Sequence, residues 1–428
     1  MESFHLTKNK IQNNKNLNVM TFGCRLNYFE SEVIKKNNNV KNKTMVINTC
    51  AVTSEAERQA RQAIRKFKKE QPSSRVVVTG CSAQIDPKSW FDMPEVSSVI
   101  GNKEKLRENI LEEGRPLFQV DDIMKVQENT SHMLHAFDNR ARAFIEIQNG
   151  CNHRCSFCII PFARGNSRSI SPIDLVKNIK ILVSDGFKEI VLTGVDIGDY
   201  GRDLTPKTTL SNLIKDILNN VPNLDRLRLS SIDPKEVDCA LMDLIVNEKK
   251  LMPYIHLSAQ SGDDEILKKM RRRHRRIDMI NLCKELRIER PEIVFGADLI
   301  AGFPFESEDM FENTLNLIEE CDLTFLHVFP YSVREGTAAA KFPQLEIGLR
   351  KKRAKILRLI GNFSKERLFN SYINKNVSVL IEENNTGYTE HFIPIRFTED
   401  LRPGTIKNFK VSSYDQFKLI GIPIESKH

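Results

Sequence analysis

Three closely spaced cysteines constrain this chain more than any other feature of its sequence. Cys151, Cys155 and Cys158 stand in a C-x3-C-x2-C pattern directly after the apolar run 142–148. That run predicts a β-strand, so the three thiols fall on the loop at its carboxyl end. Three such thiolates can each bind one iron of a [4Fe–4S] cluster and leave the fourth iron without a protein ligand. An iron of this kind is open to a substrate or a cofactor.

Two other interpretations of these cysteines stay open. One is a zinc site with His153 as the fourth ligand, although zinc sites more often use two ligand pairs some distance apart. The other is that the cysteines are buried and unreactive, although three of them so close together on a loop are unusual as packing. The spacing favours the iron–sulfur cluster over zinc, and zinc over packing.

A second group of cysteines is dispersed near the N-terminus. Three predicted strands each lead into a cysteine: 19–23 into Cys24, 44–49 into Cys50, and 76–80 into Cys81. Ligands of an open parallel sheet gather at the carboxyl ends of its strands, so these cysteines are expected to converge there. A small buried thiol at each strand end is the alternative. Three cysteines at equivalent positions favour a second three-thiolate site.

The hydrophobic pattern divides the chain into three predicted domains. Residues 18–113 alternate short apolar runs with helical segments, which predicts a parallel α/β domain. Residues 141–370 repeat β-α units without a Rossmann phosphate loop, which predicts a barrel or part of one. The stretch 114–140 is interpreted as the connection between these two domains. The strands expected in the second domain are 142–148, 189–195, 225–231, 254–260, 293–301 and 325–332.

The third predicted domain covers residues 374–428. Its short β-runs fit a small antiparallel β-barrel of about five strands. A basic amphipathic helix over 349–368 precedes it. The runs are 377–381, 391–396, 405–411 and 416–420.

Composition narrows the functional class without deciding it. The 428 residues carry a net charge of +8, which permits a nucleic-acid partner. No apolar run is long enough to span a membrane, and the first residues lack the apolar core of a signal peptide. We therefore expect a cytoplasmic protein whose nine cysteines are metal ligands or packed thiols rather than disulfides. No coiled-coil pattern is visible, and a monomer is expected.

Other charged and thiol residues admit simpler explanations. The basic run 268–276 is the densest in the chain, and both a phosphate contact and a solvated face stay open for it. Cys239, Cys283 and Cys321 lie in predicted helices without a spaced partner, so core packing is expected for them.

Several stretches of the chain resemble one known family. The string 151–161, with Phe157 immediately before the last cysteine, resembles the signature of the radical S-adenosylmethionine (SAM) superfamily. The continuation 163–169 and the segments around the three N-terminal cysteines resemble its methylthiotransferase branch. Residues 387–392 resemble the small RNA-binding β-barrel called TRAM, which ends many of these enzymes.

This resemblance implies a partial (β/α)6 barrel, two [4Fe–4S] clusters and SAM. The loop cysteines Cys151, Cys155 and Cys158 would chelate the cluster that binds SAM, and the dispersed N-terminal cysteines would hold an auxiliary cluster. No His, Asp or Glu stands out as a general base, so no catalytic side chain is predicted. The chain departs from the family pattern at Phe305, where glycine is common. The residues that the resemblance assigns to SAM are Phe157, Thr193, Gly194, Gln260 and Gly302.

The implied reaction places a methylthio group on carbon two of a modified adenosine beside the tRNA anticodon. One electron, from a donor such as flavodoxin or ferredoxin, would cleave SAM to a deoxyadenosyl radical, and a second SAM would supply the methyl group. Residues 193–201 and 48–53 most resemble the enzymes that act on threonylcarbamoyladenosine. Alternatives are the enzymes for isopentenyladenosine in tRNA or for a ribosomal-protein aspartate, and a non-catalytic, metal-stabilised RNA-binding protein.

Overall fold

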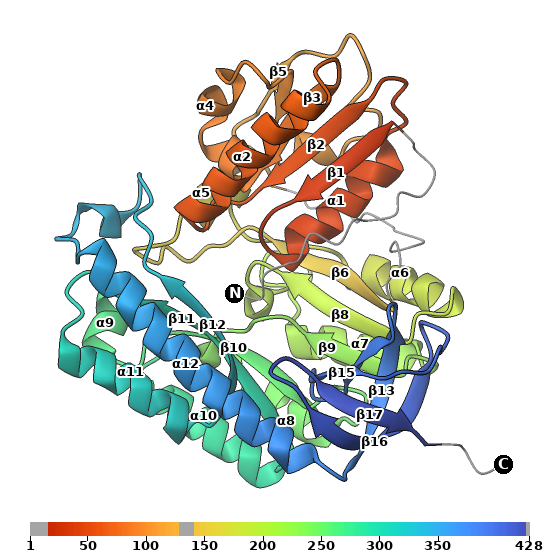
Figure 1. Cartoon of the computed structure of the whole chain (residues 1–428), viewed down its shortest axis with the longest axis vertical. Coiled ribbons are helices and arrows are strands. Elements are labelled where there is room, and N and C mark those ends of the chain that lie inside the picture. Colours follow the sequence, from red (N-terminus) through yellow and green to blue (C-terminus); the bar gives the residue numbers. More distant parts are fainter. Residues whose placement is uncertain (1–15, 128–140, 425–428) are drawn as a thin grey trace.

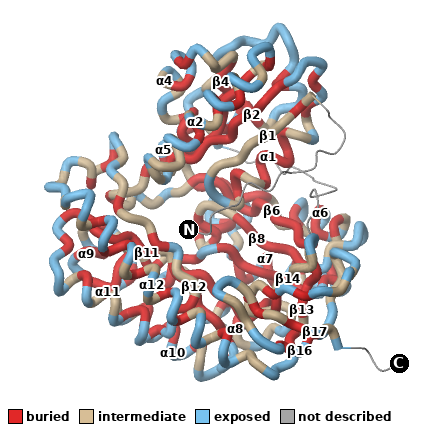
Figure 2. The backbone as a smooth tube through the Cα atoms, in the orientation of Figure 1, coloured by how far each residue is buried: buried red, intermediate tan, exposed pale blue. Residues whose placement is uncertain are grey.

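The computed structural model describes residues 16–127 and 141–424 (Figure 1). Three segments lie outside the described residues: most of the N-terminal segment, residues 128–140 of the predicted connection 114–140, and residues 425–428 of the third predicted domain. Figure 2 shows that the strands in the middle of the molecule are largely buried while the outward faces of the surrounding helices are exposed. Within the described ranges, no helix has the length and apolar character needed to cross a membrane.

The N-terminal part is a parallel sheet, as predicted, with the strand order β1-β2-β3-β4-β5. Met45 and Ile47 of the second strand pack on one side of this sheet, and Val46 packs on the other. Both faces are therefore covered by helices, as parallel sheets require. The strands are β1 (Leu17–Thr21), β2 (Thr44–Thr49), β3 (Arg75–Gly80), β4 (Ser98–Ile100) and β5 (Phe118–Gln119).

Helix α2 (Ser54–Glu70) shows how the local sequence builds this domain. The Thr53 hydroxyl accepts a hydrogen bond from the Ala56 amide at 3.2 Å and so caps the helix. Ala60, Ile64 and Phe67 follow at helical spacing and are buried against the sheet. The other helical elements here are α1 (Arg25–Asn37), α3 (Cys81–Ile85), α4 (Pro87–Phe91), η1 (Glu104–Leu106) and η2 (Ile123–Lys125).

The central part is a partial barrel of six parallel strands, which confirms the predicted fold class. Strands β6, β8 and β9 belong to one sheet, and β10, β11 and β12 form the next. Isolated parallel bridges, Leu227 with Leu251 and Ile232 with Leu257, join the two sheets. The short strand β7 (Arg168–Ser169) pairs antiparallel with β6 at the edge. The barrel strands are β6 (Arg142–Asn149), β8 (Glu189–Gly194), β9 (Arg226–Leu229), β10 (Tyr254–Gln260), β11 (Val294–Ala301) and β12 (Leu323–Pro330).

Helices cover the outside of this partial barrel and share one large apolar core with its strands. The long helix α12 (Ile347–Tyr372) crosses the strands β11 and β12 and leads to the C-terminal barrel (Figure 1). The remaining helical elements are α5 (Ile160–Arg164), α6 (Pro172–Ser184), η3 (Ile197–Asp199), α7 (Leu210–Asn220), η4 (Pro234–Glu236), α8 (Cys239–Asn247), α9 (Asp264–Lys269), α10 (Arg276–Glu289), α11 (Glu308–Glu320) and η5 (Ala338–Lys341).

The C-terminal part is a closed five-stranded barrel with the order β13-β14-β15-β17-β16. Its pairs are antiparallel as predicted, except that β15 and β17 run parallel. The predicted strand 391–396 is shorter in the structure because Phe392 takes a left-handed conformation, with φ 61°, in a turn. The strands are β13 (Asn376–Glu382), β14 (Thr386–Thr389), β15 (Pro394–Arg396), β16 (Ile406–Tyr414) and β17 (Leu419–Pro423).

This C-terminal barrel closes the amino ends of the central strands. Arg228 of β9 donates hydrogen bonds to the carbonyls of Thr389 and Glu390, at 2.8 and 2.7 Å. The ring of Phe392 lies 5.4 Å from that of Tyr254, the first residue of β10. Arg228 also pairs with the buried carboxylate of Glu189 at 2.8 Å. The interior of the partial barrel is therefore sealed at this end.

Candidate functional site

The three dispersed N-terminal cysteines come together in the structure. Cys50 and Cys81 directly follow β2 and β3, and Cys24 begins the turn into α1. Burial, together with the neighbouring Cys81 and Cys24 thiols, raises the pKa of Cys50 to about 12. Cys50 and Cys81 are buried whereas Cys24 is exposed. Burial nonetheless also raises the pKa of the Cys24 thiol.

Backbone geometry makes room for these thiols. Gly23 has a φ of 101°, and a Cβ placed there would lie 2.9 Å from the Cys50 sulfur. Only glycine adopts such a conformation at little cost, and only glycine leaves this space. Polar groups surround the sulfurs: the Asn102 amide nitrogen lies 3.8 Å from Cys81 Sγ, and the Val52 amide donates to Cys50 Sγ at 3.4 Å.

The second group of thiols lies on the loop between β6 and α5, as predicted. The Cys151 amide donates to the Gly165 carbonyl at 3.0 Å, and the Ser156 amide donates to the Met270 carbonyl at 3.0 Å. These bonds anchor the loop at both ends. Burial raises the pKa of Cys158 to about 12, with a further contribution from Cys155. The three loop thiols therefore lie within electrostatic reach of one another.

The spacing of the sulfurs argues against zinc. Four ligands on one zinc ion, with Zn–S bonds of about 2.3 Å, lie about 3.8 Å apart. Among the described residues, the only groups of three ligand atoms within 4.8 Å of one another contain no cysteine. His153, the suggested fourth zinc ligand, instead contacts Asp196 at 2.9 Å and Glu236 at 3.3 Å. Among the described residues, no cysteine therefore belongs to a group of three ligand atoms as close together as a single zinc ion requires.

One buried network joins the two cysteine groups. Arg164, in the helix after the cysteine loop, pairs with Glu30 of α1 at 2.8 Å, and Lys105 pairs with the same carboxylate at 2.6 Å. Although burial favours the neutral acid, Arg164 and Lys105 lower the pKa of Glu30 to about 2. The positive charge of Arg164 also acts on the thiols of the dispersed group.

Direct packing accompanies this network. Cys81 and Ala51 share a small apolar cluster with Ile159 and Ala163 of the loop–helix segment. The Asn102 amide donates to the Ala163 carbonyl at 2.8 Å. The two cysteine groups thus occupy two sides of one interface between the N-terminal sheet and the partial barrel.

The residues assigned to SAM all lie at the carboxyl ends of strands or on the cysteine loop. Gln260 and Gly302 end β10 and β11 in left-handed conformations, with φ values of 67° and 72°. The backbone at Gly194 lies close to that of Gln148. A Cβ added to Gly194 would lie only 2.8 Å from the Gln148 carbonyl oxygen, so a larger residue would not fit there. The buried Thr193 hydroxyl donates a hydrogen bond to the Val191 carbonyl of its own strand at 3.3 Å, so its proton already has an acceptor within the protein. Phe157 packs against the apolar cluster around Phe303.

Phe305, the departure from the family pattern, adopts a backbone conformation that favours glycine. Its φ is 70°, in the left-handed region that favours glycine. Its ring packs against Phe342, with 5.5 Å between ring centroids, and Lys269 lies 4.6 Å from it. The turn after β11 is therefore retained despite the larger side chain.

The basic run 268–276 has a mixed role. Arg272 pairs with the buried Asp233 at 2.8 Å and lies 3.7 Å from the Cys155 sulfur. His274 is buried and bonds the Ala259 carbonyl at 3.1 Å. A phosphate contact or a solvated face is therefore wrong for these two residues, because Arg272 lies between Asp233 and the cysteine loop and His274 is buried against β10. Arg271 and Arg275 are exposed.

The isolated cysteines follow the packing expectation only in part. Cys283 and Cys321 are buried and close to each other, as expected. Cys239 is exposed, so core packing is wrong for it, because it begins α8 on the side turned to solvent.

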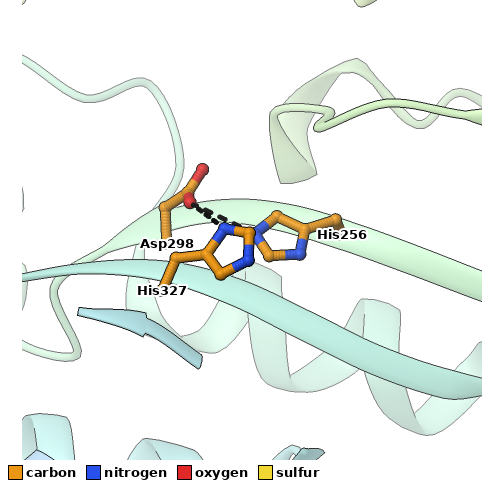
Figure 3. Close-up of side chains that lie close together, drawn as sticks. All are labelled: His256, Asp298 and His327. Carbon is orange, nitrogen blue, oxygen red and sulfur yellow. Dashed lines mark hydrogen bonds and ion pairs between the residues drawn. The ribbon is translucent and has the colours of Figure 1, made fainter. Parts of the chain in front are cut away.

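Sequence reasoning missed two groups of titratable side chains. His153, Asp196 and Glu236 form one beside Cys151, and His256, Asp298 and His327 form another inside the barrel (Figure 3). Their members are tens of residues apart, so no local motif marks them. For the second group, the available signal was a titratable residue inside each of three predicted apolar strands.

Comparison with known proteins agrees with this architecture. Residues 145–318 match the radical SAM superfamily, and residues 16–101 match the uncharacterized protein family UPF0004. A solved radical S-adenosylmethionine methyltransferase, TsrM from Kitasatospora setae, shares the fold, with a TM-score of 0.54 at 16% identity, covering 76% of this chain and 75% of that chain.

Two curated relatives are similar over nearly their whole length. The tRNA-2-methylthio-N(6)-dimethylallyladenosine synthase of Clostridium botulinum is 32% identical, covering 96% of this chain and 99% of that protein. The threonylcarbamoyladenosine tRNA methylthiotransferase MtaB of Rickettsia prowazekii is 51% identical, covering 92% of this chain and 94% of that protein. With this identity, and with both cysteine groups in one barrel-based interface, the chain belongs to the radical SAM methylthiotransferase family.

Proposed function

We propose that this chain methylthiolates carbon two of threonylcarbamoyladenosine beside the anticodon of tRNA. The 51% identity to an enzyme named for that substrate supports the choice of nucleoside. The observation that carries the proposal is the pair of three-cysteine groups that face one interface. The family uses [4Fe–4S] clusters and SAM, and each group supplies three thiols, the donor atoms that such a cluster takes from a protein.

Each cysteine group has a distinct proposed role. Cys151, Cys155 and Cys158 would hold the cluster that binds SAM, while the dispersed N-terminal group would hold the auxiliary cluster. When bound, the first supplies the electron that cleaves SAM and the second supplies sulfur. Buried Arg164 compensates negative charge on the auxiliary group.

The protein itself positions the reactants and excludes water. The hydrogen bond of Cys151 to Gly165 joins the start of the loop to the end of α5, and that of Ser156 to Met270 fixes the loop against the segment after α9. Gln260 and Gly302 present strand-end backbone at the same edge, where we propose that SAM lies together with Phe157, Thr193 and Gly194. An aromatic C–H has no acidic proton, so a general base is not required, which agrees with the absence of a predicted catalytic side chain.

A tRNA partner follows from this proposal. The target base would leave its stack to reach the interior of the barrel, as bases do in other enzymes that modify them. We further propose that a flavodoxin or ferredoxin supplies the electron, and that the chain acts as a monomer in the cytoplasm.

Mass spectrometry of tRNA nucleosides tests the proposal in cells with and without the gene. We expect only the methylthiolated threonylcarbamoyladenosine to disappear. If the methylthiolated isopentenyladenosine disappears instead, the proposed reaction stands but the proposed substrate nucleoside is wrong. No change in either nucleoside would exclude tRNA as the substrate.

A variant pair tests the cluster assignment on purified full-length protein. Cys155→Ala is expected to abolish deoxyadenosine formation from SAM under strong reductant. Cys239→Ala changes an exposed cysteine in the same way and is the matched control, with unchanged deoxyadenosine formation and iron content. Zinc in place of iron in the wild-type protein would favour the non-catalytic RNA-binding alternative.

A further inference from the structure

Three side chains form a polar group inside the partial barrel. His256, Asp298 and His327 come from β10, β11 and β12, three neighbouring strands (Figure 3). One oxygen of Asp298 lies 3.2 Å from His256 Nε2 and 3.2 Å from His327 Nδ1. The two imidazole rings lie 4.4 Å apart between centroids. We call these three residues the interior triad.

The interior triad faces the inside of the barrel. Side chains alternate across a strand, and the neighbours Leu257, Ala297 and Leu299 pack in the core shared with the outer helices. His256 and Asp298 therefore point the other way. Gly296 makes room on this inner side, since an added Cβ would lie 2.3 Å from the Tyr254 hydroxyl and 2.5 Å from His256 Nδ1.

Hydrogen bonding leaves one nitrogen of the triad for a ligand. Burial favours neutral Asp298, yet His256 and His327 hold its pKa below the usual range, so it is an ionised acceptor and both histidines donate to it. The other nitrogen of His256 is occupied by the Tyr254 hydroxyl at 2.9 Å. Among the described residues, His327 Nε2 has no hydrogen-bond partner, and 47% of the His327 side chain is exposed.

The triad also lies between the two ends of the interior. Below it, Phe392 and Tyr254 close the amino ends of the strands. Above it, the same strands lead to Gln260 and Gly302 beside the cysteine loop. The N-terminal sheet also reaches this region. Arg25, which directly follows Cys24 of the dispersed cysteine group, has its guanidinium carbon 5.2 Å from the centroid of the Phe392 ring. A base held between the two cysteine groups would thus have the triad within the same interior.

The two nucleosides considered for this family differ in the chemistry of the group on N6. The threonylcarbamoyl group carries amide, hydroxyl and carboxylate functions, whereas the dimethylallyl group is purely apolar. A site built to hydrogen-bond a polar group strongly rejects an analogue that lacks it, because its own polar atoms are left unpaired. A polar residue exposed inside the barrel therefore favours the polar nucleoside.

We propose that His327, oriented by Asp298, hydrogen-bonds the threonylcarbamoyl group and selects it over an apolar N6 group. This inference rests on the proposed function and adds a specificity-determining residue to it. Asp298 acts through His327 and is a positioning residue.

The test compares His327→Phe with His327→Gln in the full-length protein carrying its clusters. Phenylalanine keeps an aromatic ring beside His256 and removes the hydrogen bond, whereas glutamine is the control that keeps a polar side chain. With threonylcarbamoyladenosine tRNA, we expect His327→Phe to lower kcat/KM by about 10- to 100-fold, and His327→Gln to lower it by less than about threefold. The ratio of activities on isopentenyladenosine tRNA and threonylcarbamoyladenosine tRNA is expected to rise for His327→Phe. Cluster absorbance and deoxyadenosine formation without tRNA should equal wild type for both variants.

Other outcomes separate this inference from the proposed function. If the wild-type enzyme does not modify threonylcarbamoyladenosine tRNA, the proposed function fails and the inference fails with it. If the wild type is active and His327→Phe keeps both its kcat/KM and its substrate ratio, only the inference is overturned. A stoichiometric divalent ion that is present in the wild type and lost in His327→Phe would overturn it in favour of a metal site.

Discussion

The central barrel meets its two neighbours through two buried ion networks that differ in what lies beside them. At the N-terminal sheet, Arg164 and Lys105 share Glu30, and cysteines lie on both sides of the contact. At the C-terminal barrel, Arg226 and Arg228 share Glu189, and the described contacts there involve no cysteine. The difference indicates that similar electrostatics serves chemistry at one interface and closure of the barrel at the other.

The strongest test of this contrast is Cys50→Ala at the first interface. We expect methylthiolation to fall by about 1,000-fold or more, because the auxiliary cluster would lose a ligand. Deoxyadenosine formation from SAM should continue, since the cysteine loop is intact. Quantifying both products and the iron content of the same sample checks this. Equal loss of both products would show that the two cysteine groups do not act separately.

Arg164→Met has the next largest expected effect. Removing one partner of a buried ion pair costs about 3 kcal/mol of unfolding free energy, and a residue that supports a metal centre changes activity by about 10- to 100-fold. Denaturant unfolding and product formation per folded molecule measure the two effects. Arg58→Met is the matched control, because the Arg58–Glu55 pair is exposed and solvent screens it. Unchanged methylthiolation in Arg164→Met would show that the ion network at the N-terminal interface does not support the reaction.

Glu189→Gln tests the second interface. We expect a loss of about 3 kcal/mol in stability, because buried arginines lose their shared carboxylate. Product formation per folded molecule should stay within about twofold of wild type. A large loss of activity in a fully folded sample would assign chemistry to this interface as well.

The same carboxylate gives a pH dependence. Burial favours its neutral form, but Arg228, Arg142 and Arg226 lower the pKa of Glu189 to about 2, whereas an unfolded glutamate titrates near 4.3. Its stabilisation is therefore complete above about pH 4.3 and is lost as the pH falls through about 2, with a size of about 3 kcal/mol. Denaturant unfolding of wild type and Glu189→Gln across this pH range gives the free energy of unfolding of each. We expect the difference between the two free energies to shrink in acid. A constant difference would refute the assignment.

The smallest effect is expected away from both interfaces. The Ser307 hydroxyl caps α11 by accepting from the Met310 amide at 3.2 Å. Ser307→Ala should cost about 1 kcal/mol by removing this cap, with unchanged product formation. Thermal unfolding and nucleoside analysis check both points, and a loss of activity here would show that global stability, rather than either interface, limits the reaction.

The fold could be predicted from the sequence because its signals are local. Runs such as 44–49 and 254–260 became β2 and β10 with the same bounds, since apolar strands between helical segments leave few alternatives. The prediction was weaker at 391–396, where the left-handed Phe392 shortens the strand. No local signal marks that turn, because it is held by contacts with residues of the barrel such as Tyr254.

The sequence by itself determined the cysteine loop, the succession of strands along the chain and the family, because these depend on neighbouring residues and on hydrophobic period. Only the tertiary structure decided which distant residues meet. It paired Arg164 with Glu30 across 134 positions, and it joined His256, Asp298 and His327 through the register of three strands. Contacts of this kind depend on how sheets pack and align, and the identity of each residue alone does not encode them.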